Sequence, residues 1–370
     1  MKQFLLLSII SFLLIQCQSS NQKENIKNTN SKNTLKYAKG FEIITKNGYK
    51  QLVIKKVFQK SNKESTYILS NSSKNKNEIK VPVQKLVVTS TTHIPMLELL
   101  GSENVLVGFP NTQYISSKKT RNRIKEGKVV ELGSEQSMNT EKLMALNPEL
   151  VVGFSLHPNN KLYENIQKIG IPVIFNGDWL EETPLGRAEW IKFFGALLNK
   201  EKEADSIFNK IETEYLNAKN IAKENNKKIT VISGSMFKDV WNVPAGKSFF
   251  SSYFKDANLN YLWKHTKGTG SLQLSFEEVL DKGKKADFWF NCGLYETKTQ
   301  LTTANIHYKE FDAFKNNNLY SIAHNKGETG GLIYFELSPV RPDLVLKDLI
   351  KITQPSLLPN YKLFFYNRVK

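Results

Sequence analysis

Apolar and polar residues alternate along the first part of the chain, a pattern typical of half-buried β-strands. Between residues 35 and 70 the apolar side chains occupy every second position of three short runs, at Phe41 and Ile43, Leu52 and Ile54, and Tyr67 and Leu69. Asn47-Gly48 lies between the first two runs, and this dipeptide favours a tight hairpin turn. We therefore predict a small antiparallel hairpin or meander in front of the main body.

From residue 81 the pattern changes to alternating strands and helices. Short β-rich or buried apolar runs occupy residues 85–89, 105–109, 150–154 and 171–175, and helical patterns occupy residues 96–100, 139–146 and 161–169. Strands that alternate with helices predict a parallel sheet covered by helices.

Two helical segments follow this first α/β run. Thr183 before Pro184 is typical of a helix start, and that helix is expected to reach about Leu198. The next helix is predicted over residues 201–224, with one apolar face and a length of roughly 36 Å.

A second α/β run begins at Lys228, with strands over 229–233 and 287–290 and helices over 248–255 and 276–282. It echoes the first run. Asn139 and Ser275 are each followed two positions later by Glu, then by a short helix and a buried strand. Similar units in both halves predict an α/β protein whose two lobes are joined by one long helix.

The N-terminus indicates export. Phe4 to Ile15 is an apolar run of about twelve residues after Lys2, which suits a signal peptide and is shorter than the roughly 20 residues of a membrane span. Leu14-Ile15-Gln16-Cys17 resembles a bacterial lipobox, although Gln16 stands where a small residue is usual. We expect lipidation at Cys17 and a location on the periplasmic side of a bacterial membrane, inner or outer. A plain signal peptide is the alternative.

Cysteine count and charge narrow the class of protein. Cys17 and Cys292 are the only cysteines, so a lipidated Cys17 leaves Cys292 without a partner and excludes a disulfide scaffold. Cys292 ends an apolar run and is expected to be a buried thiol. The net charge is +17, but the lysines are scattered and no basic run is interleaved with aromatic residues, so no nucleic-acid partner is predicted.

Several segments resemble the ABC-importer binding proteins for ferric siderophores, haem and vitamin B12. They are residues 85–90, 105–109, 132–152, 274–280 and the C-terminal run 334–349, and the resemblance covers about residues 81 to 359. It implies two Rossmann-like lobes on a rigid helix, with the ligand held in the cleft between them. It also implies a monomer without catalytic activity or cofactor, whose partners are an iron or cobalt chelate and an ABC permease dimer.

The expected division of the chain follows from these patterns: signal peptide 1–17, tether 18–34, β-hairpin extension 35–80, N-terminal lobe 81–180, linking helices 181–226 and C-terminal lobe 227–370. The resemblance does not cover the extension. Glu141 and Glu277 match the family's two docking glutamates, which pair with arginines of the permease. A Glu in the first turn of a helix is also favoured by the helix dipole, so a purely structural role is the alternative.

Ligand contacts are expected at the carboxyl ends of strands, where α/β folds bind ligands. Trp179 and Trp241 follow strands in the two lobes and are the main candidates, and Phe109 and Tyr114 are weaker ones. Aromatic rings would hold a large flat chelate through stacking. Core packing is the alternative for each Trp.

Charged candidates are fewer. Arg341 could neutralise carboxylates of the ligand, or pair internally with Glu336, and Arg187 is a further candidate. His93 and His157 also follow strands and could touch a metal, although their spacing matches no closed metal motif.

Three other functions are alternatives to an importer binding protein. A binding protein for a bare zinc or manganese ion would use His93 and His157. A hydrolase is disfavoured because the chain has no Gly-x-Ser-x-Gly motif. A surface scavenger lipoprotein without a permease stays open.

Overall fold

The computed structural model describes residues 31–33, 35–58, 64–72, 78–134, 137–154 and 160–370. The predictions on the signal peptide, Cys17, the tether up to residue 30 and His157 lie outside these residues, whereas residues 31–33 of the expected tether form a short strand. Among the described residues, no helix combines the length and apolar character needed to cross a bilayer.

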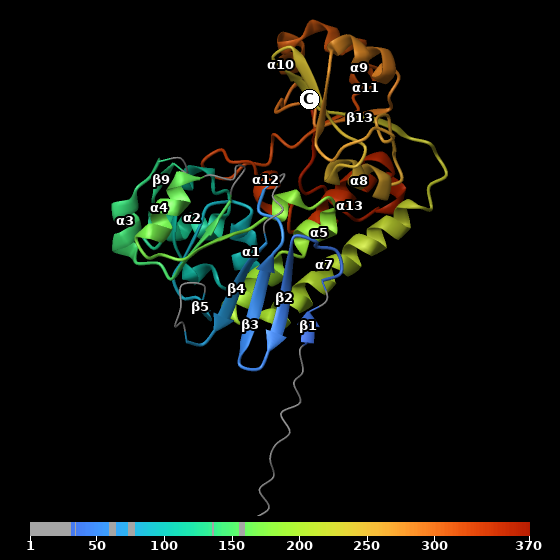
Figure 1. The fold of residues 1–370 in the computed structure, drawn as a ribbon. Helices are drawn as coiled ribbons and strands as arrows, with labels where there is room; N and C mark the ends of the chain where they lie inside the picture. Colours follow the sequence, from blue (N-terminus) through green and yellow to red (C-terminus); the bar gives the residue numbers. More distant parts are fainter. Residues whose placement is uncertain (1–30, 34, 59–63, 73–77, 135–136, 155–159) are drawn as a thin grey trace, which may run out of the picture.

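The chain enters the structure through a five-stranded sheet, which we call the N-terminal sheet (Figure 1). Its strands are β1 (Ser31–Asn33), β2 (Phe41–Lys46), β3 (Tyr49–Ile54), β4 (Ser65–Ser70) and β5 (Glu78–Lys80), in that order across the sheet. The first four are antiparallel and β5 runs parallel to β4. The predicted hairpin is β2–β3, closed at Gly48 with a positive φ of 84°. The sheet is larger than predicted, because β1 and β5 are short and have no alternating pattern.

The first lobe is built on a parallel sheet. Its strands are β6 (Leu86–Val88), β7 (Leu106–Phe109), β8 (Val130–Glu131), β11 (Leu150–Gly153) and β12 (Val173–Phe175), in the order β12-β11-β6-β7-β8. The helices of this lobe are α1 (His93–Leu99), α2 (Lys118–Lys125), α3 (Thr140–Leu146) and α4 (Lys161–Lys168), and a small ribbon joins β9 (Gly133–Ser134) to β10 (Ser137–Met138). β6 and β11 are buried at every position, as expected of parallel strands covered on both faces.

The linking region contains α5 (Pro184–Ala188), α6 (Ile191–Leu198) and α7 (Glu201–Ala222). The Thr183 side chain caps α5 as predicted, but this helix ends at Ala188 and a separate helix, α6, begins at Ile191. α7 has 22 residues and is therefore about 33 Å long. Ala204, Phe208 and Ile211 lie in the core of the first lobe. Tyr215, Ala218 and Ala222 lie in the core of the second, so one helix is packed into both.

The second lobe repeats the parallel arrangement. Its main sheet has the order β16-β13-β18-β19-β20, from β13 (Thr230–Ser233), β16 (Asn260–Tyr261), β18 (Phe288–Phe290), β19 (Leu319–Ser321) and β20 (Asn367–Arg368), of which only β20 is antiparallel. A smaller sheet joins β14 (Ser235–Phe237), β15 (Val240–Pro244) and β17 (Ser271–Leu274). The helices are α8 (Phe249–Asp256), α9 (Phe276–Gly283), α10 (Lys298–Ala304), α11 (Asp312–Lys315), α12 (Ile333–Leu337) and α13 (Pro342–Thr353), and α13 packs along α7.

The predicted fold class is confirmed. Two α/β lobes with separate cores are joined by α7, and the N-terminal sheet packs on the first lobe (Figure 1). Its inward side chains, including Phe41 and Ile43, share the first core with Trp190 and Phe193.

Candidate ligand cleft

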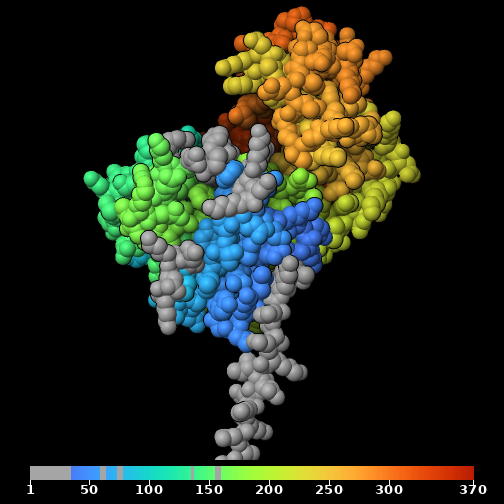
Figure 2. Space-filling view, viewed as in Figure 1, coloured from blue at the N-terminus to red at the C-terminus, as the bar shows by residue number. Residues whose placement is uncertain are grey.

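The strand order of each lobe marks where a ligand site is expected. In the first sheet β6 lies between β7 and β11, and in the second β13 lies between β16 and β18. In each sheet the chain adds strands first on one side of the central strand and later on its other side. Such a reversal of strand order opens a crevice beyond the carboxyl ends of the strands. The molecular surface is hollowed between the green first lobe and the orange second lobe, with red C-terminal residues at the bottom (Figure 2).

Large apolar side chains are exposed just beyond these carboxyl ends. Tyr114 follows β7 and is 61% exposed, Phe237 lies just after β13 and is 71% exposed, and Leu294 follows β18 and is 62% exposed. Phe335 on α12, 56% exposed, belongs to the same class. Isolated exposed apolar residues are common, but their recurrence after strands of both lobes indicates a binding surface. Of these four, only Tyr114 was predicted from the sequence.

Trp179 lies on the 3-10 helix η3 (Asp178–Leu180), directly after β12. Its ring is half-buried and packs edge-on against Phe154 at 5.7 Å. Its indole N–H has no hydrogen-bond partner among the described residues. The other four tryptophans of the chain are at most 4% exposed, so Trp179 is the one tryptophan whose ring a ligand can reach.

Arg187 on α5 connects this turn to the second lobe. Its guanidinium donates to the Trp179 carbonyl at 2.8 Å and lies 3.5 Å above the ring of Phe249 on α8. Burial lowers the pKa of Arg187, and the Asp178 carboxylate opposes that change. Burial also raises the pKa of Asp178. Arg187 therefore fixes the Trp179 turn against α8, a role the sequence did not indicate.

A second connection between the lobes lies at residues 325–337, which we call the strap. Glu336, 3% exposed, accepts the backbone N–H groups of Ser116 at 2.6 Å and Ser117 at 2.9 Å. Thr329 donates its hydroxyl to the Gln113 carbonyl, again across the lobes. Burial raises the pKa of Glu336 to about 7, although the two N–H groups act to lower it.

A cavity of about 440 Å³ lies between the strap and the first lobe. Its walls come from both lobes: Pro95, Glu98, Ser116, Ser117 and Lys118 on one side, and Lys326, Gly327, Glu328, Ile333, Glu336 and Leu337 on the other. The strap therefore lines a cavity where the two lobes meet.

Three predicted ligand contacts are wrong because their side chains are buried. Trp241 is 0% exposed, because the β14–β15 hairpin turns the chain back and packs the indole against Trp289 in the second core. Phe109 is 2% exposed at the inward-facing end of β7. His93 is 0% exposed beside Phe194, and burial lowers its pKa to about 3.

The prediction for Arg341 is also corrected. Its guanidinium forms a bidentate pair with Asp343, at 2.9 Å and 2.8 Å, and is thus occupied within α13. The alternative pair with Glu336 does not form either, since that carboxylate binds the backbone of the first lobe.

Glu141 and Glu277 are both exposed in the first turn of short helices. Asn139 caps α3 and Ser275 caps α9, the latter in a full capping box. Within the described residues neither glutamate forms an ion pair, so both carboxylates are available at the surface, one on each lobe.

Among the described residues, no group of three or more His, Cys, Asp or Glu side chains could hold a metal ion. Cys292 is fully buried, and burial raises the pKa of its thiol to about 12.

Comparisons with known proteins agree with this geometry. The model of the family described as periplasmic binding protein matches residues 86–325. An uncharacterized lipoprotein of Methanocaldococcus jannaschii is 27% identical over 297 residues, which cover 78% of this chain and 69% of that protein.

Solved structures share the fold at lower identity. A possible iron-binding, periplasmic solute-binding protein of Staphylococcus epidermidis has a TM-score of 0.58 at 16% identity, covering 74% of this chain and 99% of that one. The petrobactin-binding protein of Bacillus subtilis has a TM-score of 0.56 at 17% identity, covering 81% and 99%. A periplasmic haem-binding protein of Vibrio cholerae has a TM-score of 0.54 at 16% identity, covering 71% and 99%.

Proposed function

Since this chain belongs to the periplasmic binding protein family, we propose that it captures a metal chelate between its two lobes and delivers it to an ABC importer. The chelate classes we propose are ferric siderophores, haem and cobalamin. The observation that carries the proposal is the set of apolar side chains beyond the strands of both lobes, among which Tyr114, Phe237 and Leu294 are exposed and Trp179 is half-buried. Such side chains bury large areas against a flat or bulky ligand.

The rigid linkage between the lobes supports a bulky ligand. α7 is packed into both cores, and Arg187 and the strap add two further connections. A cleft held at nearly fixed width loses little conformational entropy on binding, which favours a preformed site for a stiff chelate. Solved proteins of this fold include a haem-binding and a petrobactin-binding protein.

We propose that Glu141 and Glu277 are the contacts for the permease. Their exposure, their free carboxylates and their matching helix positions in the two lobes support this role. We also propose that Cys17 carries a lipid anchor outside the cytoplasm, which agrees with the lipoprotein name of the archaeal relative.

Ligand binding is tested by titrating the chain from residue 18 with hemin, cyanocobalamin and ferric siderophores. Tryptophan quenching and visible absorbance report binding. For whichever of these ligands the wild-type protein binds, we expect Trp179→Ala to weaken the affinity by at least about tenfold. Leu216→Ala, which removes a 38% exposed apolar side chain from α7, is the matched control. Equal affinities in both variants would remove Trp179 from the site, and binding of none of the probes would refute the proposed ligand class.

Permease coupling is tested by uptake in cells. The double variant Glu141→Ala, Glu277→Ala should lose uptake while the purified protein keeps its ligand affinity. A control with Glu203→Ala and Glu224→Ala removes two exposed carboxylates from the linking region. Full uptake by the first double variant would contradict the docking role and favour a scavenger that works without a permease.

A further inference from the structure

The N-terminal sheet lies outside the residues that the family model matches, yet it contacts the turn that carries Trp179. A Cβ atom placed on Gly177 would lie 2.5 Å from the carbonyl oxygen of Lys56, which is two residues after the end of β3. The φ of Gly177 is −109°, which any residue can adopt. Glycine is therefore required here by the close approach of the sheet and not by the backbone conformation.

Two buried carboxylates hold the same end of the sheet. Glu181, 6% exposed, accepts the backbone N–H groups of Lys39 at 2.9 Å and Gly40 at 2.8 Å. Its Oε1 also accepts the indole N–H of Trp190 at 3.0 Å. These bonds begin two residues after Trp179, so the sheet is fixed to both sides of the Trp179 turn.

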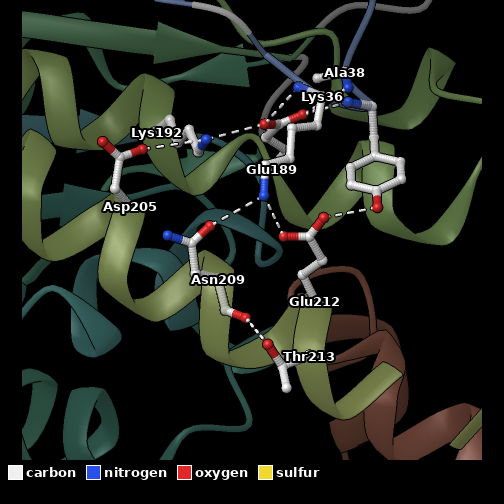
Figure 3. Close-up of polar contacts among 9 residues, drawn as sticks. Lys36, Ala38, Glu189, Lys192, Asp205, Asn209, Glu212 and Thr213 are labelled. Atoms are coloured by element: carbon white, nitrogen blue, oxygen red, sulfur yellow. Dashed lines mark hydrogen bonds and ion pairs between the residues drawn. The ribbon is translucent and has the colours of Figure 1, made fainter. Parts of the chain in front are cut away.

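Glu189 extends the attachment along the linking region (Figure 3). Its carboxylate is 0% exposed and accepts the backbone N–H groups of Lys36 at 3.0 Å, Tyr37 at 2.7 Å and Ala38 at 2.9 Å. Lys192 balances the charge at 3.0 Å. The five consecutive backbone N–H groups of residues 36–40, which precede β2, are thus bound by the side chains of Glu181 and Glu189. Arg187 lies between these two glutamates in the sequence.

Lys56, whose carbonyl oxygen approaches Gly177, also carries a positive charge. Its side chain is exposed and forms no ion pair among the described residues, whereas Lys55 beside it pairs with Glu42. The residue whose carbonyl oxygen approaches Gly177 therefore carries an exposed ammonium, which suits a ligand with an anionic group.

We propose that the N-terminal sheet forms a third wall of the ligand cleft, which positions Trp179 through Gly177 and offers the Lys56 ammonium to an anionic group of the chelate. This inference rests on the proposed function in one respect, the role of Trp179 in ligand binding. The blue surface of the sheet reaches up to the green first lobe and the yellow-green linking helices (Figure 2).

The positioning role is tested without a ligand. Trp179 is the only tryptophan that is more than 4% exposed, so acrylamide quenching of tryptophan fluorescence reports its environment. We expect Gly177→Ala to change the acrylamide quenching constant by about twofold, because the added methyl group must push the turn away from the sheet. Gly270→Ala, where an added Cβ meets nothing within 4 Å, is the matched control. Equal quenching in wild type and Gly177→Ala would overturn the positioning role.

Glu181→Gln is the second variant, for use if Gly177→Ala does not fold. It keeps the shape of the side chain and one acceptor oxygen while weakening the bonds to Lys39 and Gly40. A change in the acrylamide quenching constant, with a circular dichroism spectrum equal to that of wild type, supports the positioning of Trp179 by the N-terminal sheet. Unchanged quenching in this folded variant counts against it.

The ligand arm compares hemin, which has two carboxylates, with hemin dimethyl ester, in which both carboxylates are neutralised. Lys56→Met should weaken hemin binding by roughly threefold to tenfold and leave binding of the ester unchanged. Lys46→Met, at the hairpin end of the same sheet and without an ion pair in the described part of the chain, should change neither. Equal effects of both variants on hemin would overturn the role of the Lys56 charge. If neither probe binds but Gly177→Ala still alters quenching, the ligand proposal fails while the positioning of Trp179 stands.

Discussion

The strap makes the stability of this protein depend on pH through Glu336. This carboxylate is 3% exposed, and burial is the largest influence on it, followed by the opposing N–H groups of Ser116 and Ser117 and by repulsion from Glu98. The result is a pKa raised from its ordinary value of 4.5 to about 7. The other charged side chains around the cavity are Lys118, Lys326 and Glu328.

The sign of the effect follows from the two pKa values. Below pH 4.5 the carboxyl group is protonated in both states, and between 4.5 and about 7 only the unfolded chain loses the proton. Stability is therefore greatest at low pH and decreases as the pH rises through about 7. At about 1.36 kcal/mol for each pH unit, the full loss is about 3 kcal/mol.

Glu336→Gln isolates this contribution, because glutamine has the shape of the protonated acid and does not titrate. We expect the difference in unfolding free energy between wild type and variant to shift by about 2.5 kcal/mol in favour of the variant between pH 5 and pH 8, because part of the full loss has already occurred at pH 5. Urea unfolding at both pH values measures it. Glu328→Gln, which removes a 47% exposed carboxylate from the same cavity, should show a much smaller shift. A difference that is constant, or that shifts in favour of wild type at pH 8, would refute the reasoning and show that the Ser116 and Ser117 bonds outweigh burial.

Three further predictions concern other buried groups. Glu189→Gln should lower the free energy of unfolding by about 2–4 kcal/mol, because it weakens the acceptor of three backbone N–H groups, and Glu203→Gln on the surface of α7 should change it little in the same urea titration. At pH 5 only the unfolded chain binds a proton at His93, because the buried imidazole has a pKa of about 3. The free energy of unfolding of His93→Phe, compared with that of wild type, should therefore be about 2 kcal/mol more favourable to the folded state at pH 5 than at pH 8. The same difference at both pH values in urea unfolding would contradict the burial of His93. Cys292, with a pKa of about 12, should react with a thiol reagent at pH 8 only after denaturation, and rapid modification of the native protein would disprove its burial.

Local patterns predicted the elements of this fold well. The buried runs that became β11 and β18 stand between helices with clear caps, and α7 keeps one apolar face along its whole length. The break between α5 and α6 was missed, because apolar residues continue through Trp190 and no Gly or Pro marks it.

The site was harder to predict, since it depends on where the chain turns back. Trp241 and Phe237 are four residues apart, and only the hairpin of β14 and β15 decides that the first is buried and the second exposed. That hairpin turns at Lys238, a non-glycine residue with a φ of 56°, which carries no turn signal in the sequence. Glu336 and Ser116 are separated by 220 residues, so no local pattern reveals their bond.

The linking helix α7 has a consequence for how the protein comes apart. Its first half completes one core through Phe208 and Ile211, and its second half completes the other through Tyr215 and Ala218. If either lobe unfolds, the half of α7 that packs in that lobe loses its contacts, and the other half is left with an unsupported end that can fray. The two lobes are therefore expected to unfold cooperatively, and a ligand that stabilises one of them also protects the other against unfolding.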